Sequence, residues 1–248
     1  MQKSEYRNIF QNESEHFYYT GTHQTTVKLL KKYLIKDDHL NILDAGCGTG
    51  LLLKKLSSFG KTWGVDLSEE ALRFAHKRKL KRLFLGSVTS LPFKKNTFDV
   101  IVCIDVLYHR RVSEDTKALS EFYRVLKPGG ILILKVPAYQ WLRGNHDIIA
   151  QTKHRYTKSE VTQKLKRANL DILKISYANS YILPLALFKR FILDNFFAVN
   201  PISDVQKLPN SINKLLTFIN TVENQFLNFF NLPFGLSIYS VSRKSSLR

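Results

Sequence analysis

The chain has 248 residues, of which 44% are hydrophobic, so it can bury a sizeable core in one large domain or one domain with an elaboration. No apolar run reaches the roughly 18 uncharged residues of a transmembrane helix, and the polar residues 1–7 lack the apolar region of a secretory signal. Two cysteines, Cys47 and Cys103, stand at the ends of predicted buried strands, which excludes a disulfide framework and fits a reducing compartment. We therefore expect a globular protein of the cytoplasm.

The charge is strongly basic, because 38 Lys and Arg residues against 20 Asp and Glu give a formal net charge of +18. Such a field attracts polyanions, including nucleic acid, anionic lipid and phosphorylated substrates. The basic residues are spread through the chain, and many lie on the outer faces of predicted helices. Two interpretations stay open: solvated helix faces, or a surface that binds nucleic acid or the inner face of a membrane.

Residues 1–40 precede the first predicted strand and are expected to form an N-terminal helical lid. An aromatic cluster that includes Tyr19 comes just before Gly21, which suggests a hinge, and a helix is predicted over residues 25–35. Two roles are open for the aromatic side chains: closing over a bound ligand to exclude water, or packing the helix onto the sheet. In the first role Tyr19 would bind substrate.

Residues 41–50, NILDAGCGTG, are the stretch around which the rest of the chain is organised. A short apolar strand runs into Asp44 and three alternating glycines, Gly46, Gly48 and Gly50, and a helix is predicted over residues 51–58. Glycine has no Cβ and tolerates positive φ, so this strand-to-helix turn can present backbone N–H groups to a polar ligand. The strict alternation differs from the G-x-G-x-x-G of dinucleotide sites, which points away from NAD.

A second strand, predicted over residues 61–65, ends at Asp66, 22 residues after Asp44. A carboxylate at the tip of the second strand of a βαβ unit can accept hydrogen bonds from both hydroxyls of a ribose. The alternative role is a cap for the next helix, but Ser68 already supplies that cap. We therefore predict that Asp66 binds a ribose.

Residues 98–104 are almost wholly apolar, as expected for a central parallel strand that is buried on both faces. Ligands of open α/β sheets bind beyond the carboxyl ends of such strands. Asp105 and His109 follow this strand, so His109 is a candidate substrate contact or general base. Hydrogen-bonded packing is the alternative role for His109.

The loop over residues 137–156, which follows a strand predicted over residues 131–136, combines polar and aromatic side chains over an unusual length. This composition predicts a substrate loop. Its candidate substrate-binding residues are Tyr139, His146, Arg155 and Tyr156, and His154 is a second candidate base. They would bind an anionic or hydroxylated acceptor. The alternative is a polar network that orders a long loop.

The pattern after residue 157 predicts a helix over residues 158–168, a strand over 171–177 and an antiparallel last strand over 235–242. Residues 181–234 are more apolar than a surface connection needs. They are expected to form a helical insertion that caps the active site, makes a dimer or, over the apolar residues 181–193, lies on an anionic membrane. The predicted organisation is a lid at 1–40, a core at 41–180 with 235–248, and the insertion at 181–234.

Five motifs occur in a fixed order: ILDAGCGTG at residues 42–50, GVDLS at 64–68, LPF at 91–93, FDVI at 98–101 and LKPGG at 126–130. In this order they resemble the motifs of class I S-adenosylmethionine-dependent methyltransferases, over about residues 41–177 and the closing strand. The resemblance implies an α/β fold, a Rossmann-like and mostly parallel seven-stranded sheet with an antiparallel last strand and helices on both faces. It also implies an enzyme that uses S-adenosyl-L-methionine as its cofactor.

The resemblance assigns roles to matching residues. Asp44, Gly46, Cys47, Gly48 and Gly50 would surround the methionine end of the cofactor, Asp66 would bind its ribose, Leu67, Ser87 and Val88 would lie near its adenine, and Asp105 would lie beside its methionyl amine. Ser87 departs from the family pattern, in which an Asp commonly stands at this place and gives a charged acceptor. Related quinone-type enzymes can carry a metal-binding carboxylate and histidine set near His109. Here Tyr108 stands where a second carboxylate would be wanted, and we predict no metal.

Three functions stay open. The first is methylation of a small or lipid-linked acceptor, a sugar or quinone-like hydroxyl, since the chain also resembles methyltransferases associated with cell-surface polysaccharide or lipid-linked saccharide pathways. The second is an RNA methyltransferase, which the charge favours, although no N-P-P-[FY] tetrapeptide follows the fourth strand. The third is a non-catalytic partner protein that keeps the fold. The sequence leaves the oligomeric state open.

Overall fold

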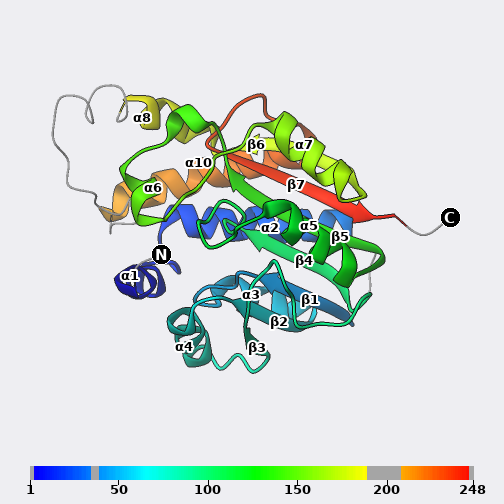
Figure 1. Cartoon of the computed structure of the whole chain (residues 1–248). Coiled ribbons are helices and arrows are strands. Elements are labelled where there is room, and N and C mark those ends of the chain that lie inside the picture. Colours follow the sequence, from blue (N-terminus) through cyan, green and yellow to red (C-terminus); the bar gives the residue numbers. More distant parts are fainter. Residues whose placement is uncertain (1–2, 35–38, 189–207, 246–248) are drawn as a thin grey trace.

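A single seven-stranded sheet forms the centre of the molecule, in a computed structural model that describes residues 3–34, 39–188 and 208–245 (Figure 1). The strand order is β3-β2-β1-β4-β5-β7-β6. The strands are β1 (Leu40–Ala45), β2 (Gly60–Asp66), β3 (Leu83–Leu85), β4 (Phe98–Ile104), β5 (Leu126–Pro137), β6 (Leu170–Ala178) and β7 (Ser237–Lys244). Only β7 runs antiparallel to its two neighbours, β5 and β6. The predicted fold class is confirmed.

Helices cover both faces of the sheet, and each face has its own apolar core. The helices of the described residues are α1 (Lys3–Asn12), α2 (Phe17–Tyr33), α3 (Leu51–Leu56), α4 (Glu69–Lys77), α5 (Asp115–Val125), α6 (Asn145–Ile149), α7 (Lys158–Arg167), α8 (Leu183–Phe188) and α10 (Asn210–Phe229). Phe122 of α5 and Leu165 of α7 pack in the core of one face. Leu30 of α2 and Leu56 of α3 pack in the core of the other face. Strand β4 contributes to both cores, as its apolar sequence predicts.

The helix that follows Asp66 begins where its sequence signals predict. The Ser68 hydroxyl accepts a hydrogen bond from the backbone N–H of Ala71 at 3.3 Å and so caps α4. Glu69 and Glu70 lie in its first turn, while His76 and Lys77 lie in its last, which complements the helix dipole. Ser68, and not Asp66, is therefore the N-cap residue of α4.

The N-terminal region differs from the prediction. The helix expected over residues 25–35 begins at Phe17, and the His16 side chain caps it by accepting a hydrogen bond from the Tyr18 N–H. Gly21 therefore lies inside α2 and is not a hinge. A Cβ on Gly21 would lie 2.1 Å from the Nδ2 atom of Asn220, so glycine is needed here for the close approach of α10.

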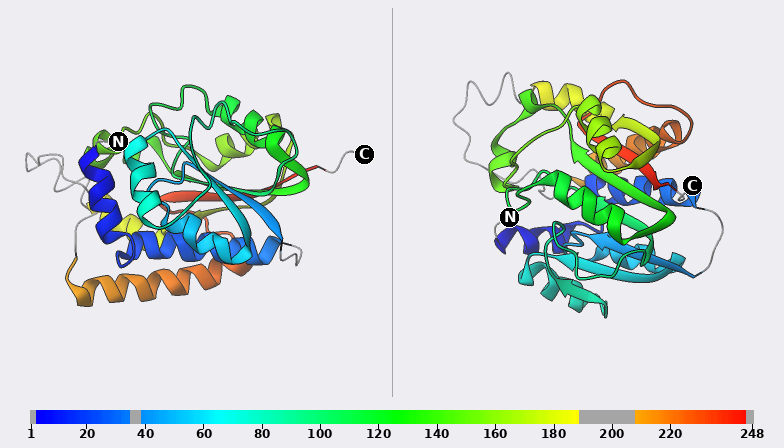
Figure 2. Two further views of the ribbon diagram at one scale, coloured as in Figure 1. Left: turned by 90° about the horizontal axis from the view of Figure 1, so that it is seen from below. Right: turned by 45° about the vertical axis from the view of Figure 1, so that its right-hand side comes forward.

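The insertion contributes one long helix, α10, which packs along α2 on the far side from the sheet (Figure 2). Residues 180–188 form a 3₁₀ turn and the short helix α8, while residues 189–193 of the predicted apolar helix lie outside the described residues. The described part of the chain contains no helix that is long and apolar enough to cross a membrane.

Candidate functional site

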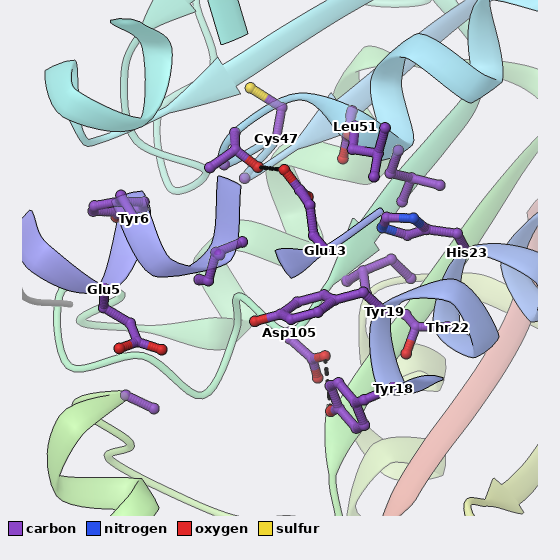
Figure 3. Close-up of a pocket in the computed structure, with 18 of the residues that line it drawn as sticks. Glu5, Tyr6, Glu13, Tyr18, Tyr19, Thr22, His23, Cys47, Leu51 and Asp105 are labelled. Atoms are coloured by element: carbon purple, nitrogen blue, oxygen red, sulfur yellow. Dashed lines mark hydrogen bonds between the residues drawn. The ribbon is translucent and has the colours of Figure 1, made fainter. Parts of the chain in front are cut away.

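A cavity of about 200 Å³ opens at the carboxyl end of β1 and β4, where helices α1 and α2 meet the sheet (Figure 3). The sheet side contributes Asp44, Gly46, Cys47, Gly48 and Thr49 from β1 and its loop, and Ile104, Asp105 and Tyr108 from the end of β4. The N-terminal side contributes Glu5, Tyr6, Ile9, Glu13, Tyr18, Tyr19, Thr22 and His23. The N-terminal segment thus closes over the edge of the sheet that the sequence marked as the ligand site.

The three glycines of the loop after β1 all have positive φ, but different neighbours require them. A Cβ on Gly46 (φ +89°) would lie 2.2 Å from Val106, and one on Gly50 (φ +83°) would lie 2.6 Å from Leu80. A Cβ on Gly48 (φ +53°) would meet nothing within 4 Å. Gly46 and Gly50 are therefore needed for packing, while Gly48 leaves its backbone open to the approach of a ligand.

Asp44 is buried at the wall of the cavity and is only 2% exposed. Among the described residues its Oδ2 atom has no hydrogen-bond partner. Burial, together with the nearby charge of Asp66, raises the pKa of Asp44 to about 8. A buried acceptor without a partner is costly, so this carboxyl group is suited to bind a donor or cation that enters the cavity.

Asp66 ties the glycine loop to the start of α4. Its Oδ2 accepts the N–H of Gly48 and its Oδ1 accepts the N–H of Ser68, both at 2.9 Å. Burial raises the pKa of this carboxyl group, and the two N–H groups oppose that shift. Leu67 and Ser68 line a second hollow beside Asp66, and Tyr6 lines both hollows, so the two are adjacent.

A network that the sequence analysis missed holds Asp105 at the cavity wall. Lys135 of β5 is completely buried, and its Nζ donates to Asp105 Oδ2 at 2.6 Å and to the Tyr18 hydroxyl at 2.8 Å. The Tyr18 hydroxyl in turn points at the Asp105 carboxylate (Figure 3). Asp105 takes a left-handed φ of 58°, which this network stabilises. The sequence did contain a signal for this network: a lysine stands inside an otherwise apolar strand, and an aspartate follows the neighbouring strand.

Glu13 is a second residue that the sequence did not single out. It accepts hydrogen bonds from the Thr49 hydroxyl and from Arg78 Nη2, the latter at 2.6 Å. Burial raises the pKa of Glu13, and its two partners oppose the shift. This contact joins the N-terminal segment to the glycine loop and to the end of α4.

His23 lies in the cavity wall with Tyr19, which the sequence predicted there. Burial lowers the pKa of His23 to about 3, so its imidazole is neutral at physiological pH. Its Nδ1 atom has no hydrogen-bond partner among the described residues. The cavity therefore contains two buried polar atoms without partners, one on His23 and one on Asp44.

The three residues predicted near an adenine differ in their exposure and in their hydrogen bonds. Leu67 is exposed and lines the second hollow, while Val88 is buried in the core. The Ser87 hydroxyl lies 2.7 Å from the Thr89 hydroxyl and accepts the Thr89 N–H. Ser87 thus already has partners within its own turn.

The two candidate bases lie outside the residues that line the cavity. His109 Nδ1 accepts the N–H of Arg111 at 3.1 Å, and burial lowers the pKa of His109 to about 4. His154 Nε2 pairs with Glu160 at 2.9 Å.

The predicted substrate residues of the loop after β5 also lie outside the cavity lining. Arg155 makes an ion pair with buried Asp147 at 2.9 Å, and buried Tyr156 hydrogen-bonds Asp115 at 3.0 Å. The Tyr139 ring stacks with the Trp141 ring and with the Tyr177 ring. These contacts favour the polar network over the substrate loop. His146 lies in α6, and its side chain is outside the described residues; Ile149 and Ala150 are the members of this loop that line the cavity.

Metal ligands are not grouped in the described ranges, 3–34, 39–188 and 208–245, where no set of three or more His, Cys, Asp or Glu side chains could hold an ion.

The strand order, the glycine loop and the acidic residues at the ends of β1 and β2 define the fold of class I methyltransferases. Solved structures agree: a SAM-dependent methyltransferase of Thermotoga maritima has a TM-score of 0.62 at 18% identity and covers 98% of this chain and 95% of its own. A Haloferax volcanii methyltransferase, solved with the Trm112 methyltransferase activator, has a TM-score of 0.61 at 16% identity and covers 99% and 95%. At these identities the likeness concerns the fold.

The sequence comparisons identify the domain. Residues 43–134 match the methyltransferase domain family. An uncharacterized protein of Methanocaldococcus jannaschii is 36% identical over 166 residues, which are 65% of this chain and 66% of that protein. Demethylmenaquinone methyltransferases of Symbiobacterium thermophilum and Lactiplantibacillus plantarum are 41% and 33% identical, over 39% and 49% of this chain. The chain spans 41% and 59% of these two enzymes. Residues 43–134 are thus a methyltransferase domain, within a sheet that has the class I methyltransferase fold.

Proposed function

We propose that the chain is an S-adenosylmethionine-dependent methyltransferase that methylates a hydroxyl group of a small or lipid-linked acceptor. A quinone-like ring is the first candidate for this acceptor, and a sugar is the second. The main supporting observation is the cavity in which unpartnered Asp44 Oδ2, the open Gly48 backbone and an aromatic wall meet. The matched domain supports the reaction type.

The residues fit the methionine end of the cofactor. Asp44 offers a buried oxygen without a partner to the methionyl amine, and Gly46, Cys47 and Gly48 line the same wall. Gly50 sets the turn through its contact with Leu80. Asp105, just after the neighbouring strand β4, is a second carboxylate on the sheet side of the cavity, but Lys135 already holds its Oδ2. We therefore propose that Asp44 is the main partner of the methionyl amine.

The nucleoside end belongs to the second hollow. Asp66 would exchange part of its hydrogen bonding to Gly48 and Ser68 for the ribose hydroxyls. Leu67 would flank the adenine with its exposed side chain, while Ser87 and Val88 would border it from the turn after β3. Ser87 gives a neutral acceptor, so the adenine contact would be weaker than with an aspartate by about 1 kcal/mol.

The cofactor supplies a methyl group on a positively charged sulfur, and the chain has to position the acceptor and exclude water. In well-oriented reactions, correct positioning lowers the activation free energy by on the order of 7–11 kcal/mol. Lys135 and Tyr18 fix Asp105, and Glu13 fixes the N-terminal segment against Thr49, so both walls are held. General-base catalysis by His109 or His154 would require movement, because neither lines the cavity.

The acceptor side of the cavity is aromatic. Tyr18, Tyr19 and Tyr108 line it, together with Ile149 and Ala150 of the loop after β5. Burial raises the pKa of all three tyrosines well above its usual value, so they stay neutral hydrogen-bond donors. Neutral phenols suit a planar ring that carries oxygen atoms. The similarity to two demethylmenaquinone methyltransferases also supports a quinone-like ring.

The test has two stages. Calorimetry with S-adenosylmethionine should give binding to the wild type that Asp66→Ala weakens by roughly 100-fold, since a ribose contact made by a charged acceptor is lost. No binding to a folded wild type would favour a non-catalytic partner protein. Incubation with a membrane-lipid extract and methyl-labelled cofactor should then transfer one labelled methyl group to a lipid-soluble ring compound.

An RNA methyltransferase is the second candidate, and the net charge of +18 favours it. RNA binding driven by this charge would fall steeply with salt. Absence of RNA affinity at low ionic strength would exclude this candidate, while labelled RNA in the transfer assay would replace the first proposal.

A further inference from the structure

Helix α10 differs from an ordinary surface helix, because most of its large apolar side chains face the solvent. Its exposed large apolar side chains are Ile212, Leu215, Phe218, Val222, Phe226 and Phe229, and Phe229 is 78% exposed. At 3.6 residues per turn these six positions fall within an arc of about 120°. Such a stripe normally faces a protein core. We call these six side chains the α10 apolar face.

The buried face of α10 carries Asn220 and Asn224 beside Leu227, and hydrogen bonds of its asparagines fix the orientation of the helix. Asn224 Oδ1 accepts a hydrogen bond from the Thr25 hydroxyl, and Asn220 Nδ2 donates to the Tyr181 hydroxyl at 2.9 Å. Asn213 Oδ1 accepts the N–H of Phe17 at 2.9 Å. Rotating the helix to bury its apolar face would break these bonds and leave amide groups unpaired. The α10 apolar face therefore points outward, on the outer layer of the molecule (Figure 2).

Positive charge without acidic partners borders the α10 apolar face. Lys32 Nζ donates to the carbonyl of Asn228, and Lys174 Nζ donates to the carbonyl of Phe230 at 3.0 Å, so both lysines lie at the end of α10 beside Phe229. Burial and the charge of Lys32 lower the pKa of Lys174. Within the described residues neither lysine makes an ion pair with a carboxylate.

The acidic residue of α10 does not offset this charge. Glu223 turns toward the protein, where it accepts the backbone N–H of Ser180 at 2.7 Å. Lys214, by contrast, is exposed on the same helix. A second copy of this chain would bring the same positive charges against each other, whereas an anionic lipid surface complements both the apolar stripe and the lysines.

We propose that the α10 apolar face docks on the surface of an anionic membrane, with Lys32 and Lys174 against lipid phosphates. The helix lies in the plane of the surface and does not cross it. The sequence analysis offered residues 181–193 as one candidate for such a contact, and residues 189–193 lie outside the described residues; the present proposal rests on α10. This inference stands apart from the proposed function, since it concerns a surface outside the cavity.

Flotation of the full chain with vesicles tests the proposal. Vesicles of phosphatidylcholine with phosphatidylglycerol should carry the wild type upward, and those of phosphatidylcholine alone should carry roughly tenfold less, because the headgroup charge is missing. Replacing Phe218, Phe226 and Phe229 together by Gln should lower binding to anionic vesicles roughly tenfold or more. The matched control replaces three apolar side chains that are exposed elsewhere, Phe84, Trp141 and Ile148, by Gln and should leave binding unchanged.

A second pair of variants isolates the charge. Lys32→Gln with Lys174→Gln should weaken binding roughly tenfold, while Lys94→Gln with Lys95→Gln removes the same net charge elsewhere and should change it little. Circular dichroism melting confirms that each variant is folded. Equal flotation of the triple Phe variant and the wild type would overturn the proposal. So would failure of the wild type to float, and sedimentation as a dimer that the triple variant dissociates would assign the face to a second copy.

Discussion

Two regions at the same edge of the sheet contain buried polar side chains, and they differ in whether those side chains have partners. In the cavity, Asp44 Oδ2 and His23 Nδ1 have no hydrogen-bond partner among the described residues. In the loop after β5, Arg155 pairs with Asp147 and Tyr156 with Asp115. Polar groups that a protein leaves unpaired cost stability, so they mark a place where a ligand completes the bonding. The paired groups of the loop serve the fold itself.

The largest expected effect is on stability and concerns Lys135, a buried residue beside the cavity wall whose ammonium group is fully paired. Lys135→Met leaves the Asp105 carboxylate without its buried cation and should lower the free energy of unfolding by about 3 kcal/mol. Lys127→Met is the control, because Lys127 and its partner Asp99 are both partly exposed and the loss should stay under about 1 kcal/mol. Chemical denaturation measures both. Equal losses would show that the buried network is no stronger than a surface pair.

The next effect separates ligand binding from stability. Asp44→Asn should weaken S-adenosylmethionine binding by roughly 10–100-fold, because Asp44 can lose its proton and pair with the bound ammonium group whereas Asn cannot, while stability stays the same or rises. Asp147→Asn should do the reverse: it breaks the pair with Arg155 and lowers stability by about 2 kcal/mol, with unchanged cofactor affinity. Calorimetry and denaturation on both variants test this. If Asp44→Asn only destabilised the chain, the distinction between the two regions would be wrong.

The pH dependence of stability gives a third effect, in the protein without cofactor. The pKa of Asp44 is raised from an ordinary value of 3.8 to about 8, so the folded chain keeps a proton that the unfolded chain loses above about pH 4. This contribution is fully present below that pH and is lost as the pH rises through about 8, by at most about 1.4 kcal/mol per pH unit. Denaturation between about pH 5 and pH 8 should show a steeper decline for the wild type than for Asp44→Asn. Parallel curves would contradict the prediction.

The smallest effect is expected in the loop. Tyr156→Phe removes one buried hydrogen bond to Asp115 and should lower stability by about 1 kcal/mol. Methyl transfer at saturating substrate should stay within about twofold of the wild type, since this hydroxyl does not reach the cavity. A rate loss of about 100-fold in a folded variant would return Tyr156 to the substrate site.

Much of the sheet could be predicted because each strand carries its own signal. The apolar run of β4 requires burial on both faces, and the glycines with positive φ, Gly46 and Gly50, come directly after the end of β1. The candidate site was predictable where it uses these local signals. It was missed where residues distant in sequence meet, as in the contact of Glu13 with Thr49 and of Lys135 with Tyr18.

The sequence alone determined where most core strands lie along the chain and where the glycine loop lies, since periodicity and glycine chemistry act over a few residues. It did not determine the direction in which α10 faces. The same amphipathic pattern would suit a buried apolar face, and only the tertiary structure shows Asn220 and Asn224 packed on α2 with the phenylalanines outward. Gly21 is a second example. From the sequence, a hinge glycine before a helix cannot be told from a glycine that lets a neighbouring helix approach, and only the position of α10 in the structure distinguishes the two. Long-range packing decides such cases, because the free energy belongs to the contact between two segments and to neither segment by itself.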